Sequence, residues 1–168
     1  MLRGLKKKQT ILKVIEENPG SGFLDIHNFT GFGHGVVSHH LNTLEKEGHV
    51  RINREKRNIW VFQSSFDPDD DKIVIALRKE TCKKILLFLL ESGSSDFSHI
   101  QNTIKKSPGT LSYTLKNLVE QDVVKIVHGF PKKYVLKDVT KTQELLDRLT
   151  VSNTDKLKDR FADTFSYL

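Results

Sequence analysis

The chain has 168 residues, of which 37% are hydrophobic and 29% are charged, and its formal net charge is +6. This composition is typical of a folded chain and excludes a disordered one. The longest apolar run, ILLFLL, is too short to span a membrane, and no apolar segment of the secretory-signal type follows the basic N-terminus. Because the single cysteine, Cys82, cannot form a disulfide within the chain, we expect a cytoplasmic protein.

The charge is unevenly distributed. Residues 1–63 carry a net charge of +4 and residues 72–137 carry +7, whereas residues 64–71 carry −4 and residues 138–168 carry −1. Two basic blocks separated by an acidic segment indicate two modules with a polyanionic partner. Lysine-rich surfaces also keep many proteins in solution, so charge alone does not identify this partner as nucleic acid.

The sequence contains an internal repeat. Residues 11–62 align with residues 85–136 without a gap, at an offset of 74 residues, and 14 of the 52 positions are identical. Most identities fall at apolar or turn positions, as in the pair Leu41 and Leu115. Such self-similarity predicts that one fold occurs twice in the chain.

Each copy is predicted to contain three helices followed by a β-hairpin. In the first copy, the apolar spacing and the Gly and Pro breakers predict helices at 9–18, 23–30 and 35–47 and strands at 49–53 and 58–62. In the second copy, the same order predicts helices at 82–92, 96–105 and 109–121 and strands at 123–127 and 133–137. The apolar face of the third helix in the first copy consists of Val37, Leu41 and Leu44, which we expect in the core.

Three segments lie outside the repeat. The acidic segment 64–71 is predicted to start a helix at about Asp69, because carboxylates stabilise a helix N-terminus. The next residues are apolar on more than one face, which predicts burial between modules or between chains; they are Ile73, Val74, Ile75 and Leu77. The tail, 138–168, is predicted to form two helices, the second with the apolar stripe Leu157, Phe161, Phe165 and Leu168. This stripe would pack on the second copy or form a dimer interface.

Three helices and a hairpin within about sixty residues form the winged helix-turn-helix plan. The segment TGFGHGVVSHHLNTLEKEGHVRI resembles the turn, recognition helix and wing entry of ArsR- and MarR-like regulators, and ALRKETCKKILLFLLESG resembles the first helix of the ArsR group. The resemblance covers roughly residues 5–137, and the tandem arrangement is similar to that of two-module regulators common in archaea. We therefore predict a mainly helical α+β chain with winged-helix domains at 1–63 and 72–137, an acidic linker at 64–71 and a helical tail at 138–168. The resemblance also implies a homodimer formed through the terminal helices, although a chain that already contains two DNA-reading modules could act as a monomer.

The exposed face of each third helix is predicted to enter the major groove of double-stranded DNA. Short polar side chains, amides and a ring on this face suit base edges, and a glycine at each helix start, Gly35 and Gly109, lets a phosphate approach the backbone. Basic hairpin residues would contact the DNA backbone. The predicted DNA-binding residues are Gly35, Val36, Ser38, His39, Asn42, Thr43, Lys46, Arg51, Arg54, Lys56, Arg57, Thr110, Ser112, Tyr113, Lys116, Asn117, Lys132 and Lys133.

The histidine cluster does not match a metal site. His39 and His40 are helix neighbours that point about 100° apart, and no pair has the i, i+4 spacing of a helical zinc site. We expect His40 to be structural and His39 to face DNA. The paired-cysteine box of the ArsR metal sensors is absent from the sequence, and no nucleotide-binding or hydrolase motif is present. We thus predict no cofactor, no metal within one chain and no enzymatic activity; a metal shared across a dimer interface stays open.

The sequence therefore predicts a sequence-specific double-stranded DNA-binding transcription regulator. An alternative is that one module, the second, docks a protein, because its recognition face carries Glu120 and Asp122 and its hairpin has no arginine. The sequence does not decide whether the second module binds DNA or docks a protein.

Overall fold

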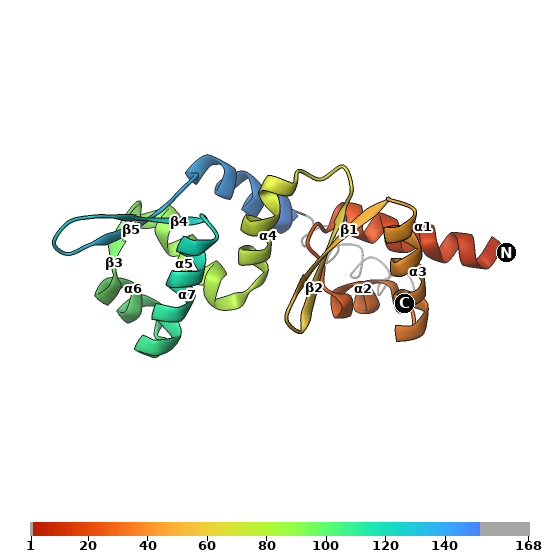
Figure 1. Ribbon diagram of the computed structural model, residues 1–168, viewed down its shortest axis with the longest axis horizontal. Coiled ribbons are helices and arrows are strands. Elements are labelled where there is room, and N and C mark those ends of the chain that lie inside the picture. The colour runs from red at the N-terminus through yellow and green to blue at the C-terminus, as the bar shows by residue number, and fades with distance from the viewer. Residues whose placement is uncertain (1, 152–168) are drawn as a thin grey trace, which may run out of the picture. The chain divides into compact units, whose positions relative to one another are not determined.

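The computed structural model describes residues 2–151 of the chain (Figure 1). These residues form two compact units: unit 1 comprises 2–71 with 149–151, and unit 2 comprises 72–148. Helices predominate in both, and each unit contains one small antiparallel sheet. The mainly helical α+β fold class is confirmed. The second predicted tail helix, with its apolar stripe, lies outside the described residues.

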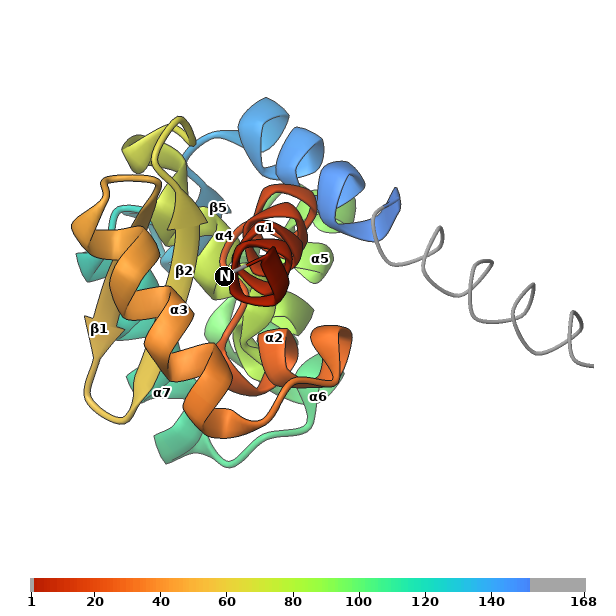
Figure 2. The same cartoon turned by 90° about the vertical axis from the view of Figure 1, so that its right-hand side faces the viewer.

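Unit 1 contains three helices followed by a two-stranded hairpin. The elements are α1 (Leu2–Glu17), α2 (Phe23–Thr30), α3 (His34–Lys46), β1 (Val50–Glu55) and β2 (Asn58–Gln63). Figure 2 shows α1 close to end-on, and α2, α3 and β2 all pack against it. The residues predicted for the core of α3 are buried, and they join apolar side chains from the other elements: Ile11, Ile15, Ile26, Val37, Leu41, Leu44, Val50 and Val61.

Local side-chain contacts set the ends of the helices in unit 1. Asn18 is buried just after α1, and its amide donates a hydrogen bond of 2.7 Å to the carbonyl of Val14. The Asp25 carboxylate accepts from the Gly22 backbone N–H at 2.9 Å, which satisfies a donor at the start of α2. Gly31 ends α2 with φ 67°, a left-handed conformation that glycine adopts without strain. These contacts place the turn before α3.

The acidic segment folds onto the first hairpin. Asp67 accepts a hydrogen bond from the Asp69 backbone N–H and caps a short 3-10 helix, η1 (Pro68–Asp70), after which α4 (Asp71–Arg78) begins. The predicted helix start at about Asp69 is therefore close to the observed one. Phe66 is buried and stacks on Phe62, with ring centroids 5.3 Å apart.

Unit 2 repeats the order of three helices and a hairpin, with an added short strand. After α4 it contains α5 (Glu80–Ser92), β3 (Ser95–Asp96), α6 (Phe97–Ile104), α7 (Pro108–Glu120), β4 (Val124–Val127) and β5 (Lys133–Leu136). The strand order in its sheet is β3-β5-β4. Strand β3 was not predicted from the sequence, because a strand of two residues leaves no alternating pattern. Its counterpart in unit 1 is a single bridge between Ser21 and Val61.

The gapless repeat is wrong by one residue in the second strand of the hairpin. In unit 1, Val61 pairs with Ile52 and bridges Ser21. In unit 2, the residue that pairs with Ile126 and with Ser95 is Tyr134, not Val135. Tyr134 is buried and Val135 is only half-buried, so the second hairpin is one residue shorter between its paired ends. The structural equivalent of Val61 is therefore Tyr134.

Two segments outside the repeat have buried apolar side chains. The apolar residues predicted to be buried in α4 have exposures of 6% or less: Ile73, Val74, Ile75 and Leu77. Residues 139–151 form a helix, which confirms the first predicted tail helix, and Asp138 caps it by accepting from the Lys141 N–H. Leu145 and Leu149, four residues apart, are buried along one side of this helix.

Candidate nucleic-acid interface

Helix α3 has one buried face and one exposed polar face. Its apolar side chains enter the core of unit 1, and the opposite face is open. The predicted DNA-binding residues on that face are exposed, except for Val36 and Thr43, which are half-buried; the exposed ones are Gly35, Ser38, His39, Asn42 and Lys46. Among the described residues, Lys46 has no acidic group within 4 Å, so its charge is available to a ligand. Thr43 is less available, because its hydroxyl donates to the His39 carbonyl at 3.0 Å.

Helix α1 adds basic side chains beside the start of α3. Arg3 and Lys7 line a surface hollow of about 360 Å³ together with Gly35, Val36 and His39. Arg3 was not among the predicted binding residues, because its position relative to α3 depends on how α1 packs. Positive charge beside a helix N-terminus favours an anion there, since the helix dipole has the same sign at that end.

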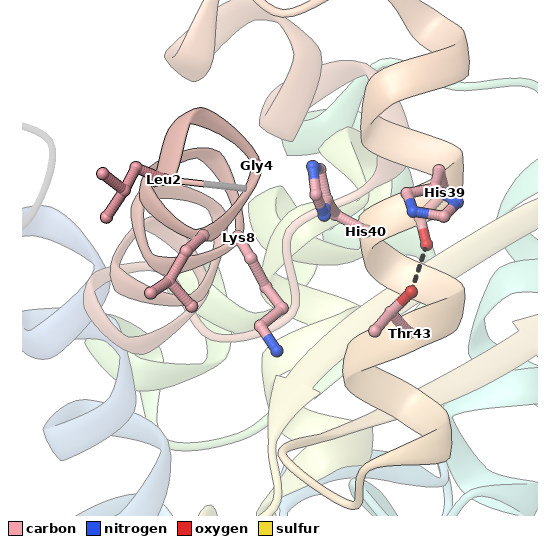
Figure 3. Close-up of a pocket in the computed structure, with 7 residues that line it drawn as sticks. Leu2, Gly4, Lys8, His39, His40 and Thr43 are labelled. Atoms are coloured by element: carbon pink, nitrogen blue, oxygen red, sulfur yellow. Dashed lines mark hydrogen bonds between the residues drawn. The ribbon is translucent and has the colours of Figure 1, made fainter.

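His39 and His40 have different environments although they are neighbours. Figure 3 shows His40 between α1 and α3, where both histidines line a hollow of about 500 Å³ with Leu2, Leu5 and Lys8. Burial lowers the pKa of His40, and the nearby positive charges, beginning with His39, lower it further. His40 is half-buried, as expected for a structural residue, whereas His39 is exposed.

Two of the basic residues predicted to bind phosphate in the first hairpin are held by carboxylates of the same unit. Arg51 contacts Asp71 through both terminal nitrogens, at 2.7 and 3.0 Å, and also donates to the Phe66 carbonyl. Arg54 contacts Glu45 of α3 through both terminal nitrogens, each at 2.8 Å. These hydrogen bonds raise the pKa of both arginines. Neither guanidinium is available to phosphate without breaking an ion pair.

The tip of the first hairpin is basic and exposed. Lys56 and Arg57 connect β1 to β2, with Glu55 and Asn58 as the last pair of the ladder. Among residues 2–151, Arg57 has no acidic partner within 4 Å. Lys8, at the other end of this unit, contacts Glu47 at 2.8 Å and is thereby partly neutralised. In unit 1, Arg57 and Lys46 are therefore the predicted cations that lie open to solvent without such a partner.

Helix α7 of unit 2 has a similar division of faces. Leu111, Leu115 and Leu118 are buried, and the predicted DNA-binding residues on the opposite side are exposed except for the half-buried Asn117: Thr110, Ser112, Tyr113 and Lys116. The Ser107 hydroxyl caps the helix by accepting from the Thr110 N–H at 3.2 Å. Lys116 lies 3.8 Å from Glu120, an exposed pair of little energetic value.

The second hairpin is more available to a polyanion than the first. Residues 124–136 contain three lysines and no acidic residue. In the described part of the chain, Lys125, Lys132 and Lys133 have no carboxylate within 4 Å, and all three are exposed. Although this hairpin has no arginine, its three lysines keep their charge available to a polyanion, because within residues 2–151 no carboxylate pairs with them.

A cluster of aromatic and imidazole rings connects α2 to the start of α3. The ring centroids of His27 and His34 are 4.5 Å apart, those of Phe23 and His34 are 5.5 Å apart, and His27 Nδ1 lies 2.6 Å from the Phe32 carbonyl oxygen. No role was predicted for His27 from the sequence.

Across residues 2–151, no three His, Cys, Asp or Glu side chains are grouped so that they could hold a metal ion. Within the same range, no helix is long and apolar enough to cross a membrane.

No protein-family model and no curated protein matches the chain. Several solved structures are similar to it at low identity, among them the following three. The transcriptional repressor BigR from Xylella fastidiosa is 20% identical with a TM-score of 0.42, over 48% of this chain and 82% of BigR. The hypothetical protein PyrSV_gp04 from Pyrobaculum spherical virus is 16% identical with a TM-score of 0.45, over 82% of this chain and 97% of that one. FabT from Streptococcus pneumoniae, in complex with DNA, is 19% identical with a TM-score of 0.33, over 68% of this chain and 72% of FabT.

Proposed function

We propose that the protein is a sequence-specific double-stranded DNA-binding transcription regulator composed of two tandem winged-helix domains. The observation that supports this most directly is the exposed polar face of α3, beside the basic tip of its hairpin. A helix of this kind fits the major groove, where amides and hydroxyls bond base edges. The same arrangement of α7 and a lysine-bearing hairpin in unit 2 supports a second contact with DNA.

Electrostatics distinguishes the expected roles of the residues. In this proposal Ser38, His39 and Asn42 contact bases, while Lys46 and Arg57 contact phosphates. Arg51 and Arg54 are assigned to the protein's own structure because each holds a carboxylate. The number of phosphates neutralised is a measurable quantity. If the protein neutralises six phosphates, its affinity for the duplex falls about 10³-fold between 50 and 200 mM salt.

The test is binding by the full chain to duplexes selected from a random pool. Anisotropy titrations over a range of salt concentrations would compare the wild type with an Asn42→Ala, Lys46→Ala double variant. A matched control is Lys13→Ala, which removes an exposed lysine of α1 that pairs only loosely with Glu17, at 3.8 Å. The proposal predicts weaker, less selective binding for the double variant alone. A salt-independent affinity, or equal losses in both proteins, would contradict it.

The alternative function, protein docking by unit 2, makes a different prediction. It is favoured by Tyr113, whose side chain is 55% exposed on α7. Charge reversal at Lys132 and Lys133 in the full chain separates the two functions. DNA binding by unit 2 predicts a large loss of duplex affinity, whereas docking predicts none. Dimerisation through the tail 138–168 is a further proposal, tested by the mass of the chain in solution with and without residues 152–168.

A further inference from the structure

The second hairpin ends in an exposed aromatic side chain. Val127 and Lys133 form the last pair of β4 and β5, and the loop 128–132 lies beyond them. Phe130, in the middle of this loop, has a relative exposure of 108%, the highest of the large hydrophobic side chains in the described range. Val127, at the end of β4, is 50% exposed. The hairpin therefore presents an apolar tip to solvent.

The hairpin that carries this apolar tip is basic. Lys132 and Lys133 follow Phe130 closely, and Lys125 lies on β4 in the same hairpin. Within residues 2–151, none of these lysines has a carboxylate within 4 Å; the Lys132 ammonium lies 5.7 Å from the centroid of the Tyr134 ring. An apolar protein groove would accept Phe130 alone, but three lysines in the same hairpin, without a carboxylate partner among residues 2–151, favour a polyanion.

The first hairpin does not share this feature. Its tip consists of Lys56 and Arg57, and no large hydrophobic side chain of α3 or of that hairpin is exposed by 36% or more. Unit 2 thus differs from unit 1 in having exposed apolar groups on both its third helix and its hairpin. The two hairpins are expected to contact DNA in different ways.

We propose that the second hairpin inserts Phe130 between adjacent base pairs from the minor groove, while Lys132 and Lys133 contact the flanking phosphates. Apolar side chains used in this way partly unstack a base step and kink the duplex by about 20–90°. The ring is then buried against bases, and the lysines neutralise phosphates beside the unstacked step. This inference deepens the function proposed above and depends on it, because it requires unit 2 to bind duplex DNA.

The experiment measures unstacking and bending in the complex of the full chain. A duplex enriched from a random pool by the wild type, labelled at its ends with a donor and an acceptor fluorophore, reports the bend by energy transfer. Permanganate, which oxidises unstacked thymines, locates the disturbed step wherever that step contains a thymine, and the energy transfer reports the bend for any sequence. The variants are Phe130→Ala and Phe130→Leu, with Val139→Ala as control, since Val139 is an exposed apolar residue outside the hairpin.

Because Phe130 is fully exposed, its replacement leaves the core intact, and circular dichroism verifies this. We expect Phe130→Ala to lose the bend and the permanganate signal and to bind about 5- to 10-fold more weakly, the order of one lost base–aromatic stack. Phe130→Leu should retain part of both signals, and Val139→Ala all of both. An unchanged bend and permanganate pattern in Phe130→Ala would overturn the inference and leave the DNA-binding function standing. If the wild type shows no salt-dependent binding to any duplex, both fail.

Discussion

Arg54 and Glu45 form a two-point ion pair that connects the first hairpin to helix α3. Each terminal nitrogen of the arginine lies 2.8 Å from one carboxylate oxygen. A planar guanidinium matches a carboxylate in this geometry, so the pair restricts the angle between hairpin and helix. The pair also lowers the pKa of Glu45. We therefore expect Arg54 to position the hairpin, leaving phosphate contact to Arg57 at its tip.

The two arginines should give different salt dependences. Arg57→Ala is expected to reduce the slope of log affinity against log salt by about 1, because one phosphate contact is lost. Arg54→Ala should weaken binding without changing that slope, whereas Glu45→Ala leaves the Arg54 guanidinium open to a phosphate and should not reduce the slope. Anisotropy titrations at several salt concentrations measure both quantities. A reduced slope in Arg54→Ala would assign its guanidinium to phosphate after all.

The ion pair between Arg51 and Asp71 should matter for stability and not for binding. Asp71 is buried, and Arg51 also donates to the Phe66 carbonyl, so the pair joins the acidic segment to the hairpin. Asp71→Asn is expected to lower the free energy of unfolding by about 1.5 to 3 kcal/mol, the range for hydrogen bonds to a charged group. Chemical denaturation measures this, with the exposed Asp69 changed to Asn as control. Equal stability in the two variants would show that the pair contributes nothing.

His40 should make the stability of unit 1 depend on pH. Its pKa is lowered from 6.5, first by burial and then by the charges of His39, Lys7 and Lys8. Below pH 6.5 the unfolded chain therefore binds more protons than the folded one, and the free energy of unfolding falls until the folded pKa is passed. Well above pH 6.5, His40 is neutral in both the folded and the unfolded chain, and this loss of stability is absent.

Urea unfolding at about pH 5.5 and 7.5 brackets the ordinary titration range of histidine. His40→Gln should reduce the difference in stability between the two conditions. His39→Gln should reduce it by less, because it removes a secondary cause of the lowered pKa. If His40→Gln has the same pH dependence as the wild type, another group is responsible.

The register of the second hairpin can be tested by two truncations. Tyr134 is 6% exposed and pairs with Ile126, whereas Val135 is half-buried. Tyr134→Ala is expected to cost about 3 to 5 kcal/mol, as for other buried aromatic residues, and Val135→Ala about 1 kcal/mol or less. Denaturant unfolding of unit 2 measures both. A larger loss of unfolding free energy in Val135→Ala than in Tyr134→Ala would show that Val135 is the equivalent of Val61, as the gapless alignment predicts.

Periodicity predicted the helices, because each buries one apolar face that recurs every three to four residues, as Val37, Leu41 and Leu44 do. It could not set the register of the second hairpin. The run Tyr134, Val135 and Leu136 is apolar throughout, so a shift of one residue leaves no mark in the sequence.

The sequence also could not predict which carboxylates pair with Arg51 and Arg54. Arg51 and Asp71 are 20 residues apart, and Arg54 and Glu45 are 9 apart, with a turn between the elements that carry them. A charge pattern gives no tertiary distance, so all basic hairpin residues looked equally available to phosphate. The structure separates them by showing which guanidinium groups already contact a carboxylate.

Gly35 and Gly109 provide a test in which stability and binding should change in opposite directions. Gly35 lies in the first turn of α3 and Gly109 in the first turn of α7, and neither has a positive φ. A methyl group at either position meets no atom within 4 Å. Alanine should therefore fit the free protein and raise the free energy of unfolding by up to about 1 kcal/mol, through its higher helix propensity.

DNA affinity should fall in the same variants, because the methyl group keeps a phosphate from the helix N-terminus. Lys13→Ala is the control: Lys13 lies in α1, its side chain is exposed, and no DNA contact is proposed for it. Thermal unfolding and duplex titration on the same preparations give the two quantities. Gains in stability without loss of affinity at both Gly35 and Gly109 would mean that neither helix start approaches the DNA backbone. A loss at Gly35 alone would assign close contact to unit 1 and leave unit 2 to bind through its hairpin.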